Sequence, residues 1–415
     1  MSRPLKFSKV SEMEDQEDTD MISRLPDELL GYMLSFLLTK SAVGTSILSS
    51  RWRYLHMLTN CLSFKAPFEV RQKKAFKKFV NRVLLLHKAS SIEKFSLDCG
   101  QHVFDDLDLH TWVTVAISKG VEQLHLSFNG QLKALPHCLF SSPKLVELKL
   151  TCIRGIQVPK SIDLPNLKIL HLRAIKFRCT GSFQKLFSAC SLLQELEVVH
   201  CEWPTYLYTS NHLCISSRKL KRLTINSLWA DFEVDAPNLA YLHYTKDDEH
   251  IALSLRNSSC LITAILDLHF TDSDLIQPVA LALIKAVGHA KELQLLGETS
   301  EYLTCFMDDH IPSYPNMVNL RLGYCTDATW KYVVHWLANS PRLETLIFEQ
   351  RLLSFNMETD EWPTDVELVP FSSRVKRLSL YKDHHKMSKD EELQASNELL
   401  MLPRASRTCV VHLTK

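Results

Sequence analysis

Glycine is scarce in this chain, with only 10 residues among 415, and the glycine-rich motifs that bind phosphate are missing. Neither GxGxxG nor GxxxxGK(S/T) occurs, so the common loops that hold nucleotide phosphates at a helix N-terminus are absent. No GxSxG motif accompanies the Ser, His and Asp residues, so the signature of a hydrolase nucleophile is absent as well. We therefore predict a protein that is not an enzyme, with no catalytic residue and no cofactor.

Cysteine occurs 12 times, but no CxxC pair or regular short spacing is present. Scattered thiols of this kind suit a reducing compartment better than a disulfide framework or a zinc ribbon, so we expect the nucleus, the cytoplasm or both. The closest grouping of possible metal ligands is Cys190, His200, Cys201 and Cys214. Because Cys190 and Cys201 flank the strand-like segment 193–198, we interpret them as packed core residues and expect no metal.

Neither sign of charge dominates, and long apolar runs are missing. Lys and Arg number 48 against 47 Asp and Glu, which gives a net charge of +1 and no global attraction to nucleic acid or an anionic membrane. No stretch approaches the roughly 20 apolar residues of a membrane span. We expect a soluble chain with no membrane partner and no nucleic-acid partner.

Residues 1–20 combine many acidic side chains with few apolar ones, and we expect them to be a disordered leader. Three short helices are predicted after it. Leu25, Leu29, Leu30, Met33, Leu34 and Leu37 share one helical face, with Pro26 at the first helical position and acidic residues behind it. The acidic cluster of the leader comprises Glu12, Glu14, Asp15, Glu17, Asp18 and Asp20.

The second and third predicted helices are short. Thr39 is a candidate N-cap for a helix carrying Val43 and Ile47, and Ser49 is a candidate N-cap for a helix carrying Trp52 and Leu55. So little chain cannot bury all these side chains internally. We therefore expect part of this apolar surface to meet a partner or the following domain.

The segment 71–82 is strongly basic, but Phe76, Phe79, Val80 and Val83 follow at helical spacing. A helix with a solvated basic face is the favoured interpretation. A nuclear-import signal or a nucleic-acid patch is the alternative.

A motif of the form apolar-x-x-apolar-x-apolar recurs twelve times through the rest of the chain, at intervals of 19 to 32 residues. These intervals scatter around the 20 to 29 residues of leucine-rich repeats. The length of the chain also exceeds what one core usually organises. The copies begin at Ile92, Val121, Leu145, Leu167, Leu193, Leu220, Leu239, Ile265, Ala290, Met317, Leu343 and Val375.

This pattern predicts an α/β solenoid in which the alternating leucines fill the core and the residues between them form a concave parallel sheet. The segments 183–190 and 329–339 look helical and are expected on the convex side. Trp203-Pro204 and Trp362-Pro363 interrupt the repeats. We favour an aromatic plug between coils for these two sites, with a target contact as the alternative, and we expect His384-His385 in an exposed loop.

Three segments near the N-terminus, 20–30 (DMISRLPDELL), 34–37 (LSFL) and 45–53 (TSILSSRWR), resemble the F-box of plant F-box proteins. In that family the helices bind a Skp-type adaptor, which attaches the receptor to a cullin. Four sites depart from the usual plant pattern: Leu38 replaces Pro, Gly44 a larger residue, Ser50 a basic residue, and His56-Met57 replaces Leu-Trp. By resemblance, the adaptor-binding residues are Leu25, Pro26, Leu29, Leu34, Ile47, Leu48 and Trp52.

The irregular repeats also resemble those of plant F-box proteins, and the segment from Val369 resembles the FBD-type tail that closes some of them. The resemblance implies five regions: an acidic leader (1–20), an F-box (21–60), a linker helix region (61–90), leucine-rich repeats (91–368) and an FBD-like cap (369–415). It predicts the non-catalytic substrate-recognition subunit of a Skp-cullin-F-box ubiquitin ligase, whose repeats hold an unidentified target protein. The alternatives are an interaction scaffold whose degenerate F-box engages no cullin, and a sensor that binds a small molecule on the repeats.

Overall fold

We describe the fold from a computed structural model, for residues 22, 24–131, 135–179, 181–204, 211–227, 230–246, 253–269, 277–297, 299–300, 313–323, 339–348, 377–381 and 410–414. The acidic leader, nearly all of the expected helix 329–339, Trp362-Pro363 and His384-His385 lie outside these residues. Most of the FBD-like tail also lies outside them.

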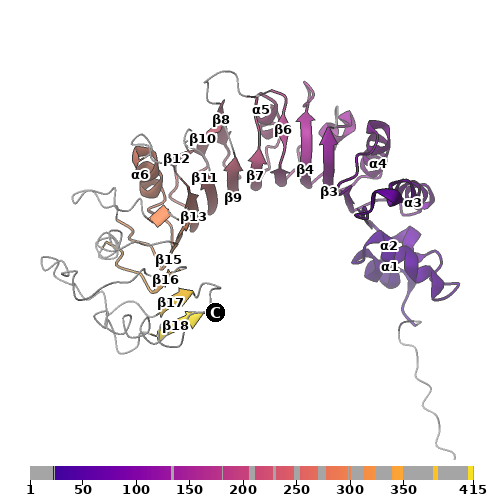
Figure 1. Cartoon of the computed structure of the whole chain (residues 1–415), viewed down its shortest axis with the longest axis horizontal. Helices are drawn as coiled ribbons and strands as arrows, with labels where there is room; N and C mark the ends of the chain where they lie inside the picture. Colours follow the sequence, from indigo (N-terminus) through magenta and orange to yellow (C-terminus); the bar gives the residue numbers. More distant parts are fainter. Residues whose placement is uncertain are drawn as a thin grey trace, which may run out of the picture.

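The chain forms an arc whose inner side is a parallel sheet and whose outer side carries most of the helices (Figure 1). Within the described residues this sheet has 15 strands, and its order follows the sequence from β1 to β18. The predicted α/β solenoid is therefore confirmed. The strands of this sheet are β1 (Cys61–Lys65), β2 (Lys94–Asp98), β3 (Gln123–Gln131), β4 (Glu147–Ile156), β5 (Ile169–Arg173), β6 (Lys176–Phe177), β7 (Glu195–Cys201), β9 (Arg222–Ser227), β11 (Tyr241–Lys246), β13 (Thr263–Leu268), β14 (Glu292–Leu296), β15 (Asn319–Leu322), β16 (Thr345–Phe348), β17 (Arg377–Tyr381) and β18 (Val410–Thr414).

Alternating leucines hold the strands in register. Leu148, Leu170, Leu196 and Leu223 pair across β4, β5, β7 and β9, and each is fully buried. Because successive strand residues point to opposite faces, the residues between the leucines line the concave side. Burial of one such leucine contributes roughly 1.5–3 kcal/mol, so stacking of the coils stabilises the solenoid.

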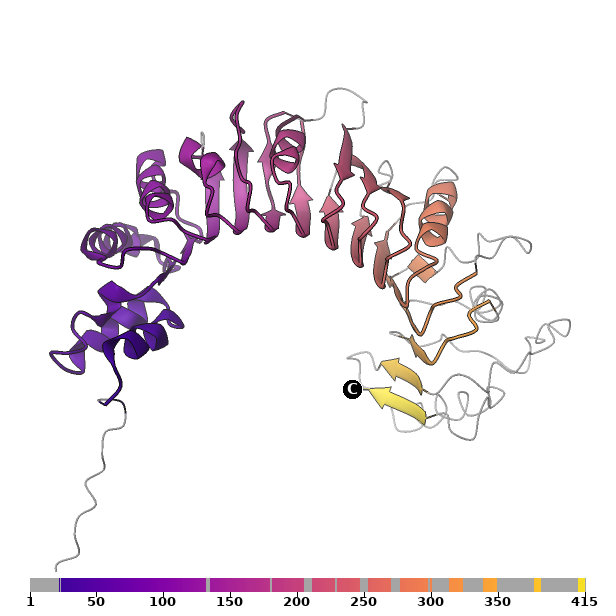
Figure 2. The same ribbon diagram turned by 180° about the vertical axis from the view of Figure 1, so that it is seen from behind.

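The convex side changes character along the arc. Near the N-terminal end it carries α3 (Lys73–Leu86), α4 (Asp106–Ser118) and α5 (Gly181–Ser188), and α6 (Gln277–Ala286) lies further along (Figure 2). Between α5 and α6 a second parallel sheet replaces the helices. It consists of β8 (Asn211–Ser216), β10 (Ala230–Asp235) and β12 (Leu253–Arg256). The predicted helices at 71–82 and 183–190 are confirmed as α3 and α5. Short 3-10 turns, η3 (Val70–Gln72) and η4 (His137–Ser141), precede α3 and β4.

Two repeat assignments differ from the sequence prediction. The copy expected at Ile265 begins four residues earlier, because Leu261, Ala264 and Leu266 are the buried residues and Ile265 lies on the concave side. Alanine at the central position hid this motif. The sheet also begins within the region predicted as a linker, since Leu62 and Phe64 of β1 pair with Phe95 and Leu97 of β2.

The N-terminal module, residues 24–58, is helical and lies at one end of the arc (Figure 1). It contains α1 (Asp27–Ser35), α2 (Thr39–Gly44) and the 3-10 turns η1 (Thr45–Ile47) and η2 (Leu55–Leu58). Pro26 precedes the first helix as its N-cap residue instead of occupying its first position.

The caps predicted for the second and third helices are wrong. Leu38 occupies the N-cap position of α2, and the Thr39 hydroxyl instead accepts a hydrogen bond from the Ser63 amide at 2.8 Å. No third α-helix follows Ser49. A turn leads into η2, and the Leu55 amide donates to the Trp52 carbonyl. This i to i+3 bond fits 3-10 geometry, in which residues three apart share one side.

Candidate functional site

The N-terminal module has a small core of its own. Leu30, Leu34, Ala42 and Leu55 form a cluster separate from the solenoid core, and Leu25 and Trp52 pack against it while remaining partly exposed. Leu34 is only 3% exposed. Of the predicted adaptor contacts, Leu34 is therefore placed to support a contact surface and not to form one.

The surface of the module is strongly apolar. Eleven of the 18 large hydrophobic residues exposed in the described part of the chain fall within residues 22–58. The predicted contacts Leu29, Ile47 and Leu48 belong to this set, with exposures of 50%, 88% and 64%, and Pro26 is exposed beside them. The complete set is Ile22, Leu29, Tyr32, Met33, Phe36, Leu37, Leu38, Ile47, Leu48, Tyr54 and Leu58. Exposed apolar side chains at this density are typical of protein-binding surfaces.

Helix α1 presents two exposed apolar sides. Leu29 and Met33 are four residues apart and share one side, and Tyr32 and Phe36 share another. The two sides adjoin, because Leu29 and Tyr32 are three residues apart, and the buried Leu30 and Leu34 lie beyond the Leu29 side. The Leu29 side of α1 therefore lies between the module's core and the Tyr32 side.

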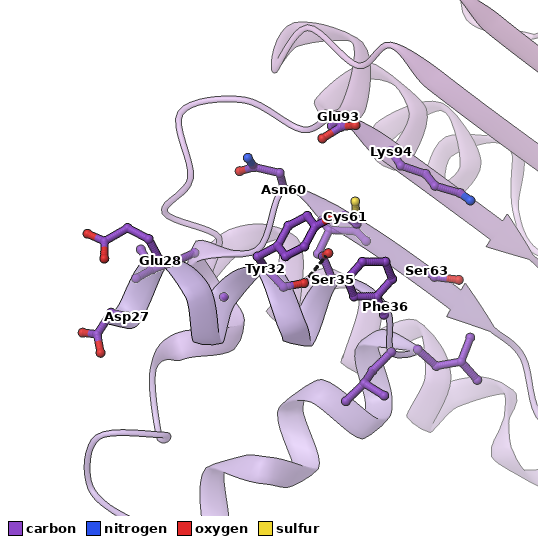
Figure 3. A pocket seen from close by; sticks show the side chains of 15 residues that line it. Asp27, Glu28, Tyr32, Ser35, Phe36, Asn60, Cys61, Ser63, Glu93 and Lys94 are labelled. Atoms are coloured by element: carbon purple, nitrogen blue, oxygen red, sulfur yellow. Dashed lines mark hydrogen bonds between the residues drawn. The ribbon is translucent and has the colours of Figure 1, made fainter. Parts of the chain in front are cut away.

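The Tyr32 side of α1 borders a groove of about 870 Å³ between the module and the first strands of the solenoid. Figure 3 shows Tyr32 and Phe36 on the side of α1 that faces Cys61 and Ser63 of β1. The two rings meet edge to face with centroids 5.0 Å apart, and the Ser35 hydroxyl donates to the Tyr32 carbonyl at 2.6 Å. Partial burial raises the pKa of the Cys61 thiol. Polar side chains at the groove are Asp27, Glu28, Asn60, Glu93 and Lys94. The sequence does not indicate this groove, because its walls come from segments far apart in the chain.

Gly31 lies in the interior of α1 at the groove, where a Cβ atom would meet no atom within 4 Å. We expect Gly31→Ala to raise the free energy of unfolding of the module by about 0.5–1 kcal/mol, because alanine has the higher helix propensity. Thermal unfolding followed by circular dichroism measures the effect. Gly44→Ala, at the last residue of α2 and equally free of neighbours, should give a smaller gain. A loss of stability in Gly31→Ala would contradict the open geometry at this position.

Hydrogen bonds hold the module together and fix it to the solenoid. Arg51 donates from Nε to the Asp27 carboxylate at 2.8 Å and from its guanidinium to the Leu25 carbonyl. The Lys88 amide, just after α3, donates to the Met57 carbonyl at 2.9 Å. Together with the hydrogen bond from the Ser63 amide of β1 to the Thr39 hydroxyl, these bonds orient the exposed surface of the module relative to the repeats.

His87 completes this junction. Its Nε2 lies 2.9 Å from the Thr59 carbonyl and its Nδ1 lies 3.0 Å from Lys119 Nζ. Because a carbonyl only accepts, Nε2 carries the proton and Nδ1 accepts from Lys119. Burial lowers the pKa of His87, and the Lys119 charge reinforces this effect against the opposing hydrogen bond to Thr59. His87 is therefore neutral at pH 7.

The lowered pKa of His87 predicts a loss of stability in mild acid. As the pH falls below the unfolded pKa of about 6.5, His87 binds a proton in the unfolded chain but stays neutral in the folded chain. The free energy of unfolding therefore decreases as the pH falls, until the lower folded pKa is reached. Urea unfolding midpoints at pH 7.5 and 5.5 measure this, and we expect His87→Gln to show a smaller difference. Some dependence should remain, because burial also lowers the pKa of His56, His125 and His243. If His87→Gln shows the same pH dependence of the urea unfolding midpoint as the intact protein, His87 does not contribute to it as proposed.

The concave sheet is a second candidate surface. Glu147 of β4 accepts hydrogen bonds from His125 at 2.8 Å and from Lys149 at 2.6 Å. Burial by itself would raise the pKa of Glu147, but the Lys149 and His125 hydrogen bonds outweigh it and lower the pKa. Burial lowers the pKa of His125, so at pH 7 Lys149 supplies the positive charge of this group.

Further along the sheet, Glu197 of β7 is only 8% exposed. Arg173 donates to both of its oxygens, through Nε and, at 3.0 Å, through Nη2. His171 lies 3.6 Å from Glu197 and 2.8 Å from Glu195. Burial would raise the pKa of Glu197, but Arg173 and His171 lower it. At these two places the concave face therefore presents carboxylates that are paired with neighbouring His, Lys and Arg side chains.

The departures from the usual plant pattern lie mainly on the surface. Ser50 and Gly44 are exposed, and Leu38 is 47% exposed at the groove. His56 is 9% exposed, and its Nδ1 has no hydrogen-bond partner among the described residues. These changes leave the module's core intact and alter the surface that a partner would meet.

The packing of Trp203 decides between the two interpretations of this residue, an aromatic plug and a target contact. Trp203 is 3% exposed and stacks on Phe177 with centroids 5.5 Å apart, while Phe183 and Phe232 meet its ring edge to face. The plug interpretation is confirmed for Trp203 and the target-contact alternative is wrong. The equivalent question for Trp362 lies outside the described residues.

Cys190 and Cys201 are buried in the solenoid core, as their structural interpretation requires. Burial raises the pKa of each thiol to about 12, and each donates to a backbone carbonyl. Among the described residues, no three His, Cys, Asp or Glu side chains are grouped as metal ligands would be. Within the same residues, no helix combines the length and the apolar character needed to cross a bilayer.

Comparison with known proteins gives a consistent result. A family profile for the LRR repeats of the FBD-associated F-box protein At5g56370 matches residues 109–260. The F-box/LRR-repeat protein At3g59190 of Arabidopsis thaliana is 32% identical over 81% of this chain and 94% of its own length. From the same plant, the F-box/LRR-repeat protein At3g59200 is 29% identical over 95% of this chain and 82% of its own length. The putative F-box/FBD/LRR-repeat protein At3g59240, also from this plant, is 32% identical over 89% of this chain and 78% of its own length. The chain therefore belongs to the plant F-box/LRR-repeat family, and the N-terminal module is the part of it that resembles an F-box.

Proposed function

We propose that this protein is the substrate-recognition subunit of a Skp-cullin-F-box ubiquitin ligase, acting in the nucleus, the cytoplasm or both. The observation that carries the proposal is the exposed apolar surface of the F-box around Leu29, Ile47 and Leu48. Burying side chains of this size contributes roughly 1.5–3 kcal/mol each. A Skp-type adaptor that covers Leu29, Ile47 and Leu48 would thus gain much of its binding energy from burying these exposed apolar side chains.

The repeat domain takes the role of holding the target in this proposal. Its concave face carries the ordered pairs around Glu147 and Glu197, and Arg222 lies 4.0 Å above the ring of Tyr241. Aromatic and arginine side chains are enriched among the residues that dominate protein interfaces. The chain then acts by proximity, because it brings a bound target close to a ubiquitin-loaded enzyme supplied by its partners.

Measured affinity for a Skp-type adaptor tests the proposal. We expect the intact protein to bind, and we expect the triple variant Leu29→Ala, Ile47→Ala, Leu48→Ala to bind at least about 100-fold more weakly, since interface hot spots are worth 2 kcal/mol or more each. All three side chains are half exposed or more, so the fold should survive. The matched control is Leu85→Ala with Leu107→Ala, two residues that are 85% and 77% exposed outside the F-box.

A second function, an interaction scaffold that engages no cullin, is favoured by the altered surface at Leu38, Gly44 and Ser50. The affinity measurement separates the two. If the intact protein fails to bind an adaptor that binds a control F-box, the receptor proposal falls and the scaffold stands. Equal affinity of the intact protein and the triple variant for the adaptor would contradict the assignment of Leu29, Ile47 and Leu48 as its contact surface.

A further inference from the structure

Helix α3 carries a row of positive charge on its outer face. Lys74, Lys78 and Arg82 follow one another at four-residue spacing and are all exposed, and Arg71 precedes them in the 3-10 turn before the helix. The opposite face is buried in the solenoid core through Phe76, Val80, Val83 and Leu84. The four cations form one surface, which we call the basic face.

The basic face has no acidic partner among the described residues. The other two lysines of α3 are engaged, since Lys77 lies 2.6 Å from Asp108 and Lys73 lies 5.5 Å from the centre of the Phe104 ring. No ion pair or hydrogen bond joins the side chains of the basic face to a described acid. Four unscreened cations in a chain with a net charge of +1 make a local positive field that attracts an anionic ligand.

An apolar side chain continues this face toward the F-box. Leu85 follows Arg82 on the same side of α3 and is 85% exposed. The combination of cations with an exposed leucine suits a peptide that is acidic and carries an apolar side chain.

We propose that residues 12–20 of this same chain dock on the basic face of α3. This segment supplies six carboxylates, from Glu12, Glu14, Asp15, Glu17, Asp18 and Asp20, together with the apolar side chain of Met13. Its charge and composition are complementary to those of the basic face. The inference goes beyond the proposed function and does not depend on it.

The connection between the segment and the helix is short enough for this contact. Leu25 packs on the same small cluster as Leu55, and the Met57 carbonyl accepts a hydrogen bond from Lys88, just beyond the end of α3. The 13 residues from Glu12 to Leu25 span at most roughly 45 Å when extended, whereas α3 is about 21 Å long. Tethering at this range gives an effective concentration on the order of millimolar, which suits weak, exposed ion pairs. The docked segment screens α3 from other anions.

Zero-length carbodiimide cross-linking of the full chain, read by mass spectrometry, tests the contact. The reagent joins a carboxylate to a lysine amine that touches it, so links from residues 12–20 should appear at Lys74 and Lys78. Lys185 is an exposed lysine on another convex helix, α5, and serves as the internal control. We expect links to Lys74 and Lys78 to exceed links to Lys185 by about tenfold, which is a modest fraction of the advantage that tethering provides.

Charge reversal provides the decisive variants. Lys78→Glu with Arg82→Glu should lower linking at Lys74 about tenfold, since each exposed ion pair is worth a factor of roughly two to five. Adding Glu17→Lys and Asp18→Lys should restore it. Lys185→Glu with Lys285→Glu changes the charge equally on α5 and α6 and should leave linking at Lys74 unchanged. Raising the salt concentration to 1 M, where the screening length falls to about 3 Å, should abolish the links.

Three results would overturn the inference. The first is equal linking to Lys74, Lys78 and Lys185, and the second is linking that ignores charge reversal. The third is linking that occurs only between chains, which a mixture of isotopically light and heavy protein reveals. None of these measurements involves the adaptor, so failure here leaves the proposed function standing, and loss of adaptor binding leaves this contact standing.

Discussion

Replacing Leu30 by alanine is expected to unfold the F-box while the repeat domain stays folded. Leu30 is fully buried in a cluster of only four buried residues, which is separate from the solenoid core. Substitutions of this kind cost about 2–5 kcal/mol, the larger values arising where the cavity cannot collapse. A core this small has little other buried surface to compensate, so the whole module should open.

Hydrogen exchange read by mass spectrometry resolves the effect by segment. In Leu30→Ala we expect amides of α1 and α2 to exchange at least about 30-fold faster, which corresponds to 2 kcal/mol, while β4 and β5 keep their protection. Adaptor binding should be lost with the module. Leu107→Ala, at a 77% exposed site, is the matched control and should change neither segment. Parallel loss of protection in β4 and β5 would show that the F-box does not open independently.

Replacing Trp203 by alanine is expected to destabilise the repeat domain by about 3–5 kcal/mol. The Trp203 ring fills the space between Phe177, Phe183 and Phe232, where the convex side changes from helix to strand. Its removal leaves a cavity at the point where α5 meets the second sheet. Urea unfolding followed by circular dichroism measures the change.

Trp203→Phe provides the matched control for that cavity. Phenylalanine keeps an aromatic ring among the three neighbours, and it removes an indole N–H that has no hydrogen-bond partner among the described residues. Since a buried unpaired donor costs about 1–3 kcal/mol, the loss of packing should be largely offset. We expect Trp203→Phe to retain most of the stability. Equal losses in the alanine and phenylalanine variants would show that the indole itself is needed.

The repeat motif predicted most of the strands because it depends on local alternation alone. A leucine two residues from another leucine in a strand points to the same face whatever surrounds it. The prediction failed at Ile265, where Ala264 occupies the leucine position and an apolar residue faces outward. It also missed β1, because Leu62 and Phe64 directly follow the F-box and are not part of a complete repeat motif.

The candidate site was less accessible from sequence. Resemblance pointed to seven adaptor contacts, but exposure separates Leu29, Ile47 and Leu48 from Leu34, whose side chain belongs to the core. The cap assigned to Thr39 failed because its hydroxyl had a better partner, the Ser63 amide, 24 residues away. Sequence proximity made the cap plausible, and tertiary packing decided against it.

By itself, the sequence determined the α/β solenoid, the helical character of the F-box and the amphipathic character of α3, because hydrophobic periodicity acts over a few neighbouring positions. Only the tertiary structure decided which apolar side chains stay exposed and how His87 fastens the F-box to the repeats. It also revealed the groove beside α1, and it showed that the basic face of α3 has no acidic partner among the described residues. Those features depend on contacts between segments far apart in the chain, whose energies are set by burial and geometry and leave no local pattern in the sequence.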